Sequence, residues 1–176
     1  AYILLNEVKT PDRLNERQFA RWCMLYCRAA DKLFKDMLYT EQLDRALAWC
    51  KNHGTAEQRA WMGLYLGRSY VKDKLFIPAM KAYSDALSLA KEKYLYDVAG
   101  YICSYMADLY TYTGQRSEER RKFEEAAEFF KQAGNERSYA FALRDVAKTW
   151  AFDDSLSLAL HYMLIADSVI TRFQDL

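Results

Sequence analysis

The apolar positions of this chain recur in steps of three and four residues, the spacing that places side chains on one face of an α-helix. Tyr83, Ala86, Leu87 and Ala90 form one such run. Short breaks that contain Gly, Pro or Asp separate the runs, as expected between helices. The pattern predicts a short helix over 1–9, followed by four pairs of longer helices. The pairs span 14–37 with 40–53, 55–73 with 76–93, 95–113 with 115–132, and 135–151 with 154–174.

The helix pairs repeat with a period of 40 residues. LGRSY at 66–70 becomes MADLY at 106–110 and VAKTW at 146–150, so each repeat has a large apolar residue, then a small one, then an aromatic. A row of alanines keeps the same spacing, at Ala46, Ala86, Ala126 and Ala166. A register kept without a gap is typical of repeats that stack on their neighbours. The repeats are predicted at about 14–53, 55–93, 95–133 and 135–174, within a single domain over 1–176.

Small residues recur where the two helices of a pair must cross. Two antiparallel helices approach closely only where the crossing carries a small side chain, and large side chains fill the space beside it. Gly67 and Ala86 occupy such positions in the second pair, as do Ala147 and Ala166 in the last. We therefore expect leucine at Ala86 to overpack its pair, at a cost of about 1–3 kcal/mol.

The balance of charged residues bears on which kinds of partner this chain can bind. The chain has 25 Lys and Arg residues against 24 Asp and Glu, a net charge of +1. A surface for nucleic acid or anionic membrane needs a basic excess, so neither is expected to be the main partner. The charged stretch 116–125 is predicted to be a solvated helix face with weak ion pairs such as Arg121 with Glu125. No apolar run approaches the length of a transmembrane helix.

Motifs for catalysis have little support in this sequence. The two histidines, His53 and His161, are isolated, and the chain contains no Gly-rich phosphate loop, nucleophile elbow or HExxH motif. We therefore expect neither an enzyme nor a bound cofactor.

One arrangement of potential zinc ligands needs weighing. If the first two long helices are antiparallel, Cys23 and Cys27 would approach Cys50 and His53. Their spacing matches no common zinc module, and Cys27 falls where the other repeats carry a small core residue. We interpret these cysteines, together with Cys103, as free thiols of a helical core and predict no metal site.

The second repeat resembles the signature of the tetratricopeptide repeat (TPR) family. LGRSY at 66–70 corresponds to L-G-x2-Y, and Ala79-x3-Tyr83 corresponds to A-x3-F. The resemblance covers about 14–174. It implies an all-α fold, an α-α superhelix (a TPR-like solenoid) of about four helix pairs plus a short N-terminal helix. It also implies a scaffold that binds a protein or peptide.

Several positions depart from the TPR signature. Gly63 stands where the signature has Trp, and Lys91 where it has Pro. Glu119 replaces the small residue in the third repeat, and Met163 replaces the aromatic one in the fourth. The period also exceeds the usual ~34 residues. The sequence therefore resembles extended TPR variants with longer helices, whose period overlaps that of HEAT repeats.

A narrower resemblance is to TPR proteins of Bacteroidetes bacteria. It rests on AYILLNEV at 1–8, the long helix that follows, and Asn52-His53-Gly54. In that group the array commonly precedes a membrane helix, a coiled coil and a signalling or DNA-binding module, often at the cell envelope. The resemblance implies the interaction or sensor portion of a larger signalling protein, in the envelope or periplasm, with the cytoplasm left open. The chain is interpreted as a mature or excised fragment.

In TPR arrays the first helix of each pair lines a concave groove where partners usually bind. Carried over by the 40-residue register, the groove positions are Arg21, Met24, Arg28, Trp61, Tyr65, Arg68, Tyr101, Tyr105, Asp108, Phe141, Arg144 and Lys148. Aromatic side chains beside Arg and Lys suit an extended peptide with apolar and acidic side chains. The alternative is that these aromatics pack between the helices.

The last helix is apolar on nearly all sides, whereas a terminal repeat normally has a polar outer face. We expect an exposed apolar face here, covered by further repeats or by a second copy in a homodimer. Its residues are Leu160, Leu164, Ile165 and Phe173. Two alternatives to the peptide scaffold follow: a structural module that self-associates through its ends, and an allosteric receptor for a peptide or small ligand.

Overall fold

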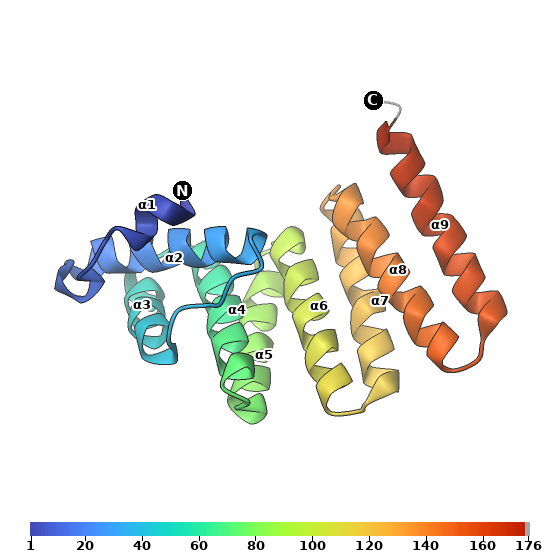
Figure 1. The fold of residues 1–176 in the computed structure, drawn as a ribbon, viewed down its shortest axis with the longest axis horizontal. Helices are drawn as coiled ribbons and strands as arrows, with labels where there is room; N and C mark the ends of the chain where they lie inside the picture. Colours follow the sequence, from blue (N-terminus) through green and yellow to red (C-terminus); the bar gives the residue numbers. More distant parts are fainter. Residues whose placement is uncertain (175–176) are drawn as a thin grey trace. The chain divides into compact units, whose positions relative to one another are not determined.

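The computed structural model describes the backbone of residues 1–174 and the side chains as far as Arg172, and this part of the chain is helical without any strand (Figure 1). The long helices pack against their neighbours in the chain after a short N-terminal helix, which confirms the predicted fold class. In chain order the elements are α1 (Tyr2–Asn6), the 3-10 turn η1 (Pro11–Arg13), α2 (Glu16–Lys32), α3 (Thr40–His53), α4 (Ala56–Lys72), α5 (Phe76–Glu92), α6 (Tyr96–Tyr112), α7 (Arg116–Gln132), α8 (Glu136–Phe152) and α9 (Leu156–Gln174).

The helices are grouped in two compact units. The N-terminal unit, Ala1–Lys93, contains α1 to α5, and the C-terminal unit, which starts at Tyr94, contains α6 to α9. The N-terminal unit packs α2 on α3 and α4 on α5, whereas the C-terminal unit packs α6 on α7 and α8 on α9. The boundary thus falls between the second and third predicted repeats.

The 40-residue register is visible in the backbone of the turns that end α2, α4, α6 and α8. Each turn has one residue with a positive φ, at Phe34 (52°), Lys74 (59°), Gly114 (70°) and Asp154 (55°). The next amide then donates to the carbonyl five residues earlier, as Lys35 N does to Ala30 O (2.9 Å) and Leu75 N to Tyr70 O (2.8 Å). This pair of features is the Schellman motif that ends many helices. The repeat in the sequence therefore corresponds to a repeated helix end.

Replacing Lys74 with glycine is expected to stabilise the N-terminal unit by about 0.5–1 kcal/mol. Lys74 adopts the left-handed conformation, which costs an L-residue roughly 1–2 kcal/mol and costs glycine almost nothing. The greater freedom of glycine in the unfolded chain offsets part of this gain. Urea denaturation followed by circular dichroism measures the difference. Lys81→Gly, inside α5, is the control and should destabilise by about 1 kcal/mol. A loss of stability in Lys74→Gly would contradict the prediction.

The first long helix is shorter than the predicted 14–37. It begins at Glu16 because the side chain of Asn15 caps it, accepting a hydrogen bond from Gln18 N at 3.0 Å. It ends at Lys32 because Phe34 turns the backbone into the left-handed region. Leu38 lies in the irregular segment that follows, where its side chain is buried and its carbonyl accepts a hydrogen bond from Ser69 Oγ at 2.8 Å. That contact ties the segment to α4.

The structure places Gly67 at the predicted close crossing of α4 and α5. A Cβ atom on Gly67 would lie only 2.3 Å from the Tyr83 ring, so the two helices approach each other across the missing side chain. Gly63, one turn earlier, would bring a Cβ within 2.9 Å of Ala86 Cβ. Because Ala86 is packed this closely, the structure supports the expected loss of stability when leucine replaces it.

An apolar cluster lies at the core of the C-terminal unit. Ala107, Phe123 and Val146 form a buried cluster, and the rings of Trp150 and Tyr162 pack against it. This cluster joins α6, α7, α8 and α9, so all four helices of the unit share one core.

Candidate binding surfaces

Arg21 and Met24 of α2 line a hollow of about 600 Å³ in the N-terminal unit. The end of α3 forms the opposite wall, where the rings of Trp49 and His53 stack with centroids 5.0 Å apart. The Nδ1 atom of His53 lies 3.2 Å from the Trp49 carbonyl, which orients the imidazole. Arg17 also lines the hollow, so apolar and positively charged groups face the same space.

The predicted groove residues of α4 are less accessible. Tyr65 is 1% exposed, and burial raises the pKa of its hydroxyl. The ring of the partly buried Trp61 stacks on Tyr65 at 5.7 Å. Arg68 forms an ion pair with Asp31 of α2, and both side chains are largely buried. The ion pair of Arg68 with Asp31 therefore links α4 to α2, and the Tyr65 ring is packed inside the unit, as the alternative to a groove role predicts.

The predicted residues of α6 are partly engaged within the C-terminal unit. The hydroxyl of Tyr101 lies 3.1 Å from Ser138 Oγ of α8, and its ring meets Phe130 edge-on at 4.9 Å. Tyr105 is partly buried and Asp108 is exposed. Only part of this set is thus open to a partner.

The predicted residues of α8 form the most open surface. The Phe141 ring is 41% exposed, and the guanidinium groups of Arg137 and Arg144 lie over it at 5.6 and 5.1 Å from its centre. Asp145 accepts from Arg144 at 2.9 Å and from the exposed Lys148 at 3.0 Å. The exposed Phe141 ring thus lies beside three cations of α8, of which Arg144 and Lys148 are paired with Asp145 of the same helix.

The cysteines considered as zinc ligands, and interpreted as free core thiols, are buried in the N-terminal unit. Cys23, Cys27 and Cys50 are buried, and desolvation raises the pKa of each thiol, that of Cys27 to about 12. A metal ion needs the thiolate form, which such burial disfavours. His53 is exposed at the end of α3. Within residues 1–172 no three His, Cys, Asp or Glu side chains are placed to hold a metal ion.

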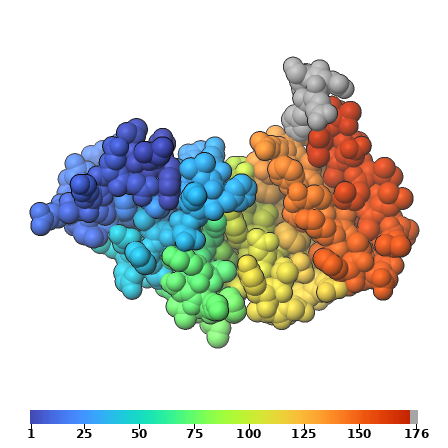
Figure 2. Space-filling model, viewed as in Figure 1, coloured from blue at the N-terminus to red at the C-terminus, as the bar shows by residue number. Residues whose placement is uncertain are grey.

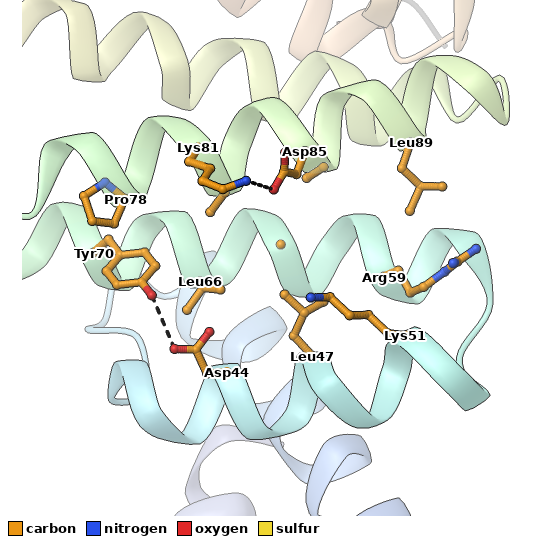
Figure 3. A pocket seen from close by; sticks show the side chains of 13 residues that line it. Asp44, Leu47, Lys51, Arg59, Leu66, Tyr70, Pro78, Lys81, Asp85 and Leu89 are labelled. Carbon is orange, nitrogen blue, oxygen red and sulfur yellow. Dashed lines mark hydrogen bonds and ion pairs between the residues drawn. The ribbon is translucent and has the colours of Figure 1, made fainter.

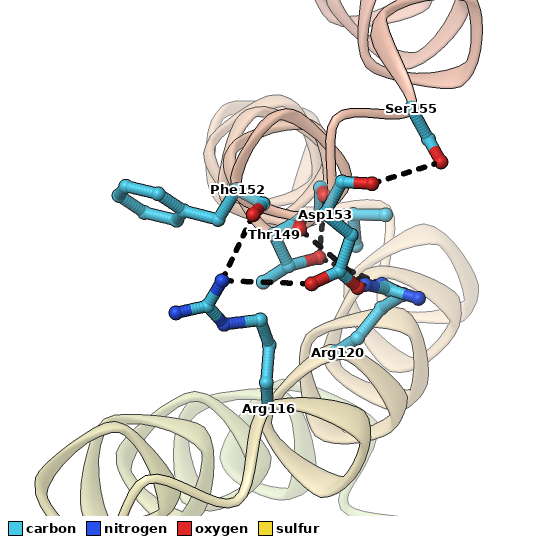
Figure 4. Close-up of polar contacts among 7 residues, drawn as sticks. Arg116, Arg120, Thr149, Phe152, Asp153 and Ser155 are labelled. Atoms are coloured by element: carbon cyan, nitrogen blue, oxygen red, sulfur yellow. Dashed lines mark hydrogen bonds and ion pairs between the residues drawn. The ribbon is translucent and has the colours of Figure 1, made fainter.

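Arg120 lies in the stretch that was predicted to be a solvated face, but its side chain is only 14% exposed (Figure 4). The guanidinium stacks 3.5 Å from the centre of the Trp150 ring and donates to Thr149 Oγ1 at 3.0 Å. It also forms an ion pair with Asp153, which follows α8. Of the pairs expected in this stretch, Arg121 with Glu125 is confirmed at 2.7 Å. Sequence gave no signal for the burial of Arg120, because charge spacing does not reveal which ring covers a guanidinium.

The Asp153 ion pair predicts a pH dependence of stability in the C-terminal unit. The hydrogen bond from Arg120 lowers the pKa of Asp153, and the charges of Arg120 and Arg116 add to this effect. A carboxyl with a lowered folded-state pKa stabilises the fold above its unfolded pKa of about 3.9, and this contribution is lost as pH falls through the folded value. Asp153→Asn should therefore be less stable than wild type at pH 7, and the difference should shrink below about pH 4. Urea titrations at several pH values measure it.

Asp154→Asn is the control for that experiment, since it removes a charge from the same turn and leaves the Arg120 contacts in place. A difference between Asp153→Asn and wild type that stays constant down to pH 2 would contradict the prediction.

Two of the four residues predicted for an apolar face on the last helix are exposed. Leu160 and Leu164 are 60% and 61% exposed, and Ile165 is partly buried. Figure 2 shows α9 (red) at the surface of its unit. Phe173 belongs to the predicted set but lies outside the described side chains. The described helices include none that is long and apolar enough to cross a membrane.

No family model matches this chain, and no curated protein does. Solved structures share its fold at low sequence identity. BtubC (BKLC) from P. vanneervenii aligns with a TM-score of 0.72 and 13% identity, over 98% of this chain and 72% of that chain. The apo form of RapI aligns with a TM-score of 0.75 and 14% sequence identity, over 96% of this chain and 62% of RapI. A structure of nearly identical TPR-like repeats of a kinesin light chain from Podosopora anserina aligns with a TM-score of 0.66 and 14% sequence identity. The alignment covers 98% of this chain and 87% of that chain.

Proposed function

We propose that this chain, whose fold is TPR-like, is a scaffold that binds a protein or peptide through exposed faces of the first helices of its pairs. Two surfaces support this proposal. One is the hollow of the N-terminal unit that Arg21 and Met24 line, and the other is the Phe141 face of α8. Both combine apolar and cationic groups, which suits a partner with apolar and acidic side chains.

The observation that carries the proposal is the exposure of Phe141. An aromatic ring left 41% exposed between two guanidinium groups offers apolar area to a partner. Aromatic and Arg side chains are enriched in the cores of protein interfaces, and the few residues that dominate binding energy are often Trp, Tyr or Arg. Arg144 and Lys148 would meet carboxylates of the partner, and Asp145 keeps these two cations in place.

Selection from a displayed library of random twelve-residue peptides tests the proposal. Peptides rich in acidic and apolar residues are expected, and fluorescence polarisation then measures their affinity. Phe141→Ala should weaken binding about thirtyfold, the effect of a residue worth ~2 kcal/mol at an interface. Phe152→Ala, on the same helix and 69% exposed, is the matched control and should bind like wild type. Selection without enrichment, or equal binding by Phe141→Ala and wild type, would refute the role of this face.

The finer part of the proposal is that the chain is the interaction or sensor portion of a larger bacterial signalling protein. It rests on the sequence resemblance to envelope-associated TPR proteins of Bacteroidetes, and the origin and location remain predictions. The open reading frame that encodes this chain tests it. A membrane helix followed by a signalling or DNA-binding module is expected, and a reading frame without either would contradict this context.

Self-association is a second candidate function, favoured by the apolar surface of α9. Leu160 and Leu164 lie one turn apart on the same helix face, and both are more than half exposed. Contiguous apolar surface of this kind is typical of an interface. Light scattering over a concentration series should show a dimer that Leu164→Glu abolishes. Ser84→Glu, an exposed change on α5, is the control and should leave the dimer intact. A monomer at every concentration would exclude this function.

A further inference from the structure

A second hollow of the N-terminal unit lies between α3 and α5 with α4 as its floor (Figure 3). Its volume is about 380 Å³, within the range of roughly 300–1,000 Å³ that ligand sites occupy. Leu47, Leu66 and Leu89 line its apolar part, one from each of the three helices. None of the twelve predicted groove residues lines it, so this surface is distinct from the two in the proposed function.

The hollow exists because Gly63 and Ala82 are small. A Cβ on Gly63 would lie 2.9 Å from Ala86 Cβ, so glycine lets α4 approach α5 without covering the floor. Two repeats later the equivalent positions carry Leu143 and Tyr162. Leu143 is buried, and the Tyr162 ring packs against the core of its own unit. The small residues that leave this floor open are therefore not repeated in the last helix pair.

One end of the hollow is positively charged. Lys51 of α3 and Arg59 of α4 lie there, as Figure 3 shows. Among residues 1–172 neither side chain has a carboxylate within 4 Å, and Arg59 Nε is buried without a hydrogen-bond partner. Glu92 pairs with Lys93 at 2.8 Å, and the charge of Arg59 adds to the lowering of the Glu92 pKa, but Glu92 makes no hydrogen bond to Arg59 Nε. A buried donor without an acceptor is unusual in a folded protein and favours an anionic ligand at this end.

The other end and the rim carry hydrogen-bond acceptors. Tyr70 donates its hydroxyl to Asp44 Oδ2 at 3.3 Å, a long contact that leaves the carboxylate able to accept further bonds. Lys81 and Asp85 pair at 2.9 Å along the α5 rim. The hollow thus offers cations at one end, aliphatic side chains in the middle and a carboxylate at the other end.

We propose that this hollow is a second binding site, for a peptide segment in which an apolar side chain is next to a carboxylate. The carboxylate lies between the cationic side chains of Lys51 and Arg59 and pairs with both. The apolar side chain covers Gly63 and contacts Leu66, and backbone N–H groups of the peptide donate to Asp44. The size of the hollow admits one or two side chains, so the site recognises a short motif rather than a whole helix.

Amide chemical shifts measured by NMR during titration with acetyl-Leu-Glu-amide test the site. Resonances of α3, α4 and α5 that line the hollow should shift, and acetyl-Leu-Gln-amide should bind at least about tenfold more weakly because a charged hydrogen bond is lost. Lys51→Gln with Arg59→Gln should remove the preference for Glu over Gln. Lys35→Gln, at an exposed cation of the same unit that lines neither hollow, is the control and should keep it.

A filling substitution gives an independent readout. Ala82→Leu should reduce affinity for acetyl-Leu-Glu-amide more than about tenfold, while Ser84→Leu, the same kind of change outside the hollow, should not. Circular dichroism shows whether each variant folds. If Ala82→Leu does not fold, the double variant Lys51→Gln with Arg59→Gln still tests the site. Equal affinity for the two dipeptides at this site, or no shifts among the residues that line the hollow, would overturn the proposal. Neither result depends on the Phe141 face, so the two proposals can fail separately.

Discussion

Replacing Phe130 with alanine is expected to destabilise the C-terminal unit by about 3–5 kcal/mol, the usual cost of emptying a buried aromatic site. Phe130 is 2% exposed and packs directly on α6. A Cβ on Gly100 would lie 2.6 Å from its ring, which shows that the helix backbone touches the aromatic face. The edge of the Tyr101 ring meets Phe130 at 4.9 Å. Alanine would leave a cavity between two helix backbones that are too rigid to close it.

Urea denaturation followed by tryptophan fluorescence measures this effect. Trp150 lies in the C-terminal unit and the other three tryptophans lie in the N-terminal unit, so excitation of single-tryptophan variants reports each unit separately. Phe152→Ala, at a ring that is 69% exposed, is the matched control and should change stability by no more than about 0.5 kcal/mol. A cost below about 1 kcal/mol for Phe130→Ala would show that α6 and α7 collapse into the space. A loss of 3–5 kcal/mol is a large share of the 5–15 kcal/mol that stabilises a typical domain.

Replacing Gly67 with alanine is expected to cost the N-terminal unit about 1–3 kcal/mol, the range for overpacking a core. Helix propensity alone predicts the opposite, a gain of about 1 kcal/mol, because Gly67 lies inside α4. The new methyl group would lie 2.3 Å from the Tyr83 ring. Tyr83 is 1% exposed, so its ring has no free space into which to move. We therefore expect steric overlap to outweigh the gain in propensity.

The double variant with Tyr83→Leu identifies the cause. If the overlap with the ring is responsible, adding Gly67→Ala to Tyr83→Leu should cost at least about 1 kcal/mol less than adding it to wild type. Thermal and urea unfolding of the four proteins in this cycle provide the measurement. Ser84→Ala, an exposed change on α5, controls for propensity without a clash and should be nearly neutral. A Gly67→Ala variant more stable than wild type would show that α5 can move away from α4.

Much of the fold followed from the sequence. The apolar spacing predicted the helix pairs, and the alanine row with Gly67 predicted their close crossings, because close helix packing requires a small residue at the crossing. Glycine also marked the turn at Gly114. The equivalent turn at Lys74 has no glycine to signal it in the sequence. A residue other than glycine adopts the left-handed conformation there because the packing on both sides imposes it.

The candidate site was predicted less well than the fold. The register placed Phe141 and Tyr65 on equivalent faces, yet Phe141 is 41% exposed and Tyr65 is 1% exposed. Helical periodicity shows which residues share a face, whereas exposure depends on what the neighbouring helix places over that face. For Tyr65 the neighbour is α2, whose Asp31 also holds Arg68.

By itself, the sequence of this protein determined the 40-residue period, the helix pairs and the crossings that need small residues, because these depend on spacing along one chain. Only the tertiary structure decided which surfaces stay open. Gly63 and Ala82 leave a hollow, whereas Leu143 and Tyr162 at the equivalent positions fill theirs. Arg120 is covered by Trp150, while Arg59 keeps a buried donor without a partner. The physical reason is that the exposure of a side chain is set by residues distant in sequence, whose positions become known only when the helices are packed.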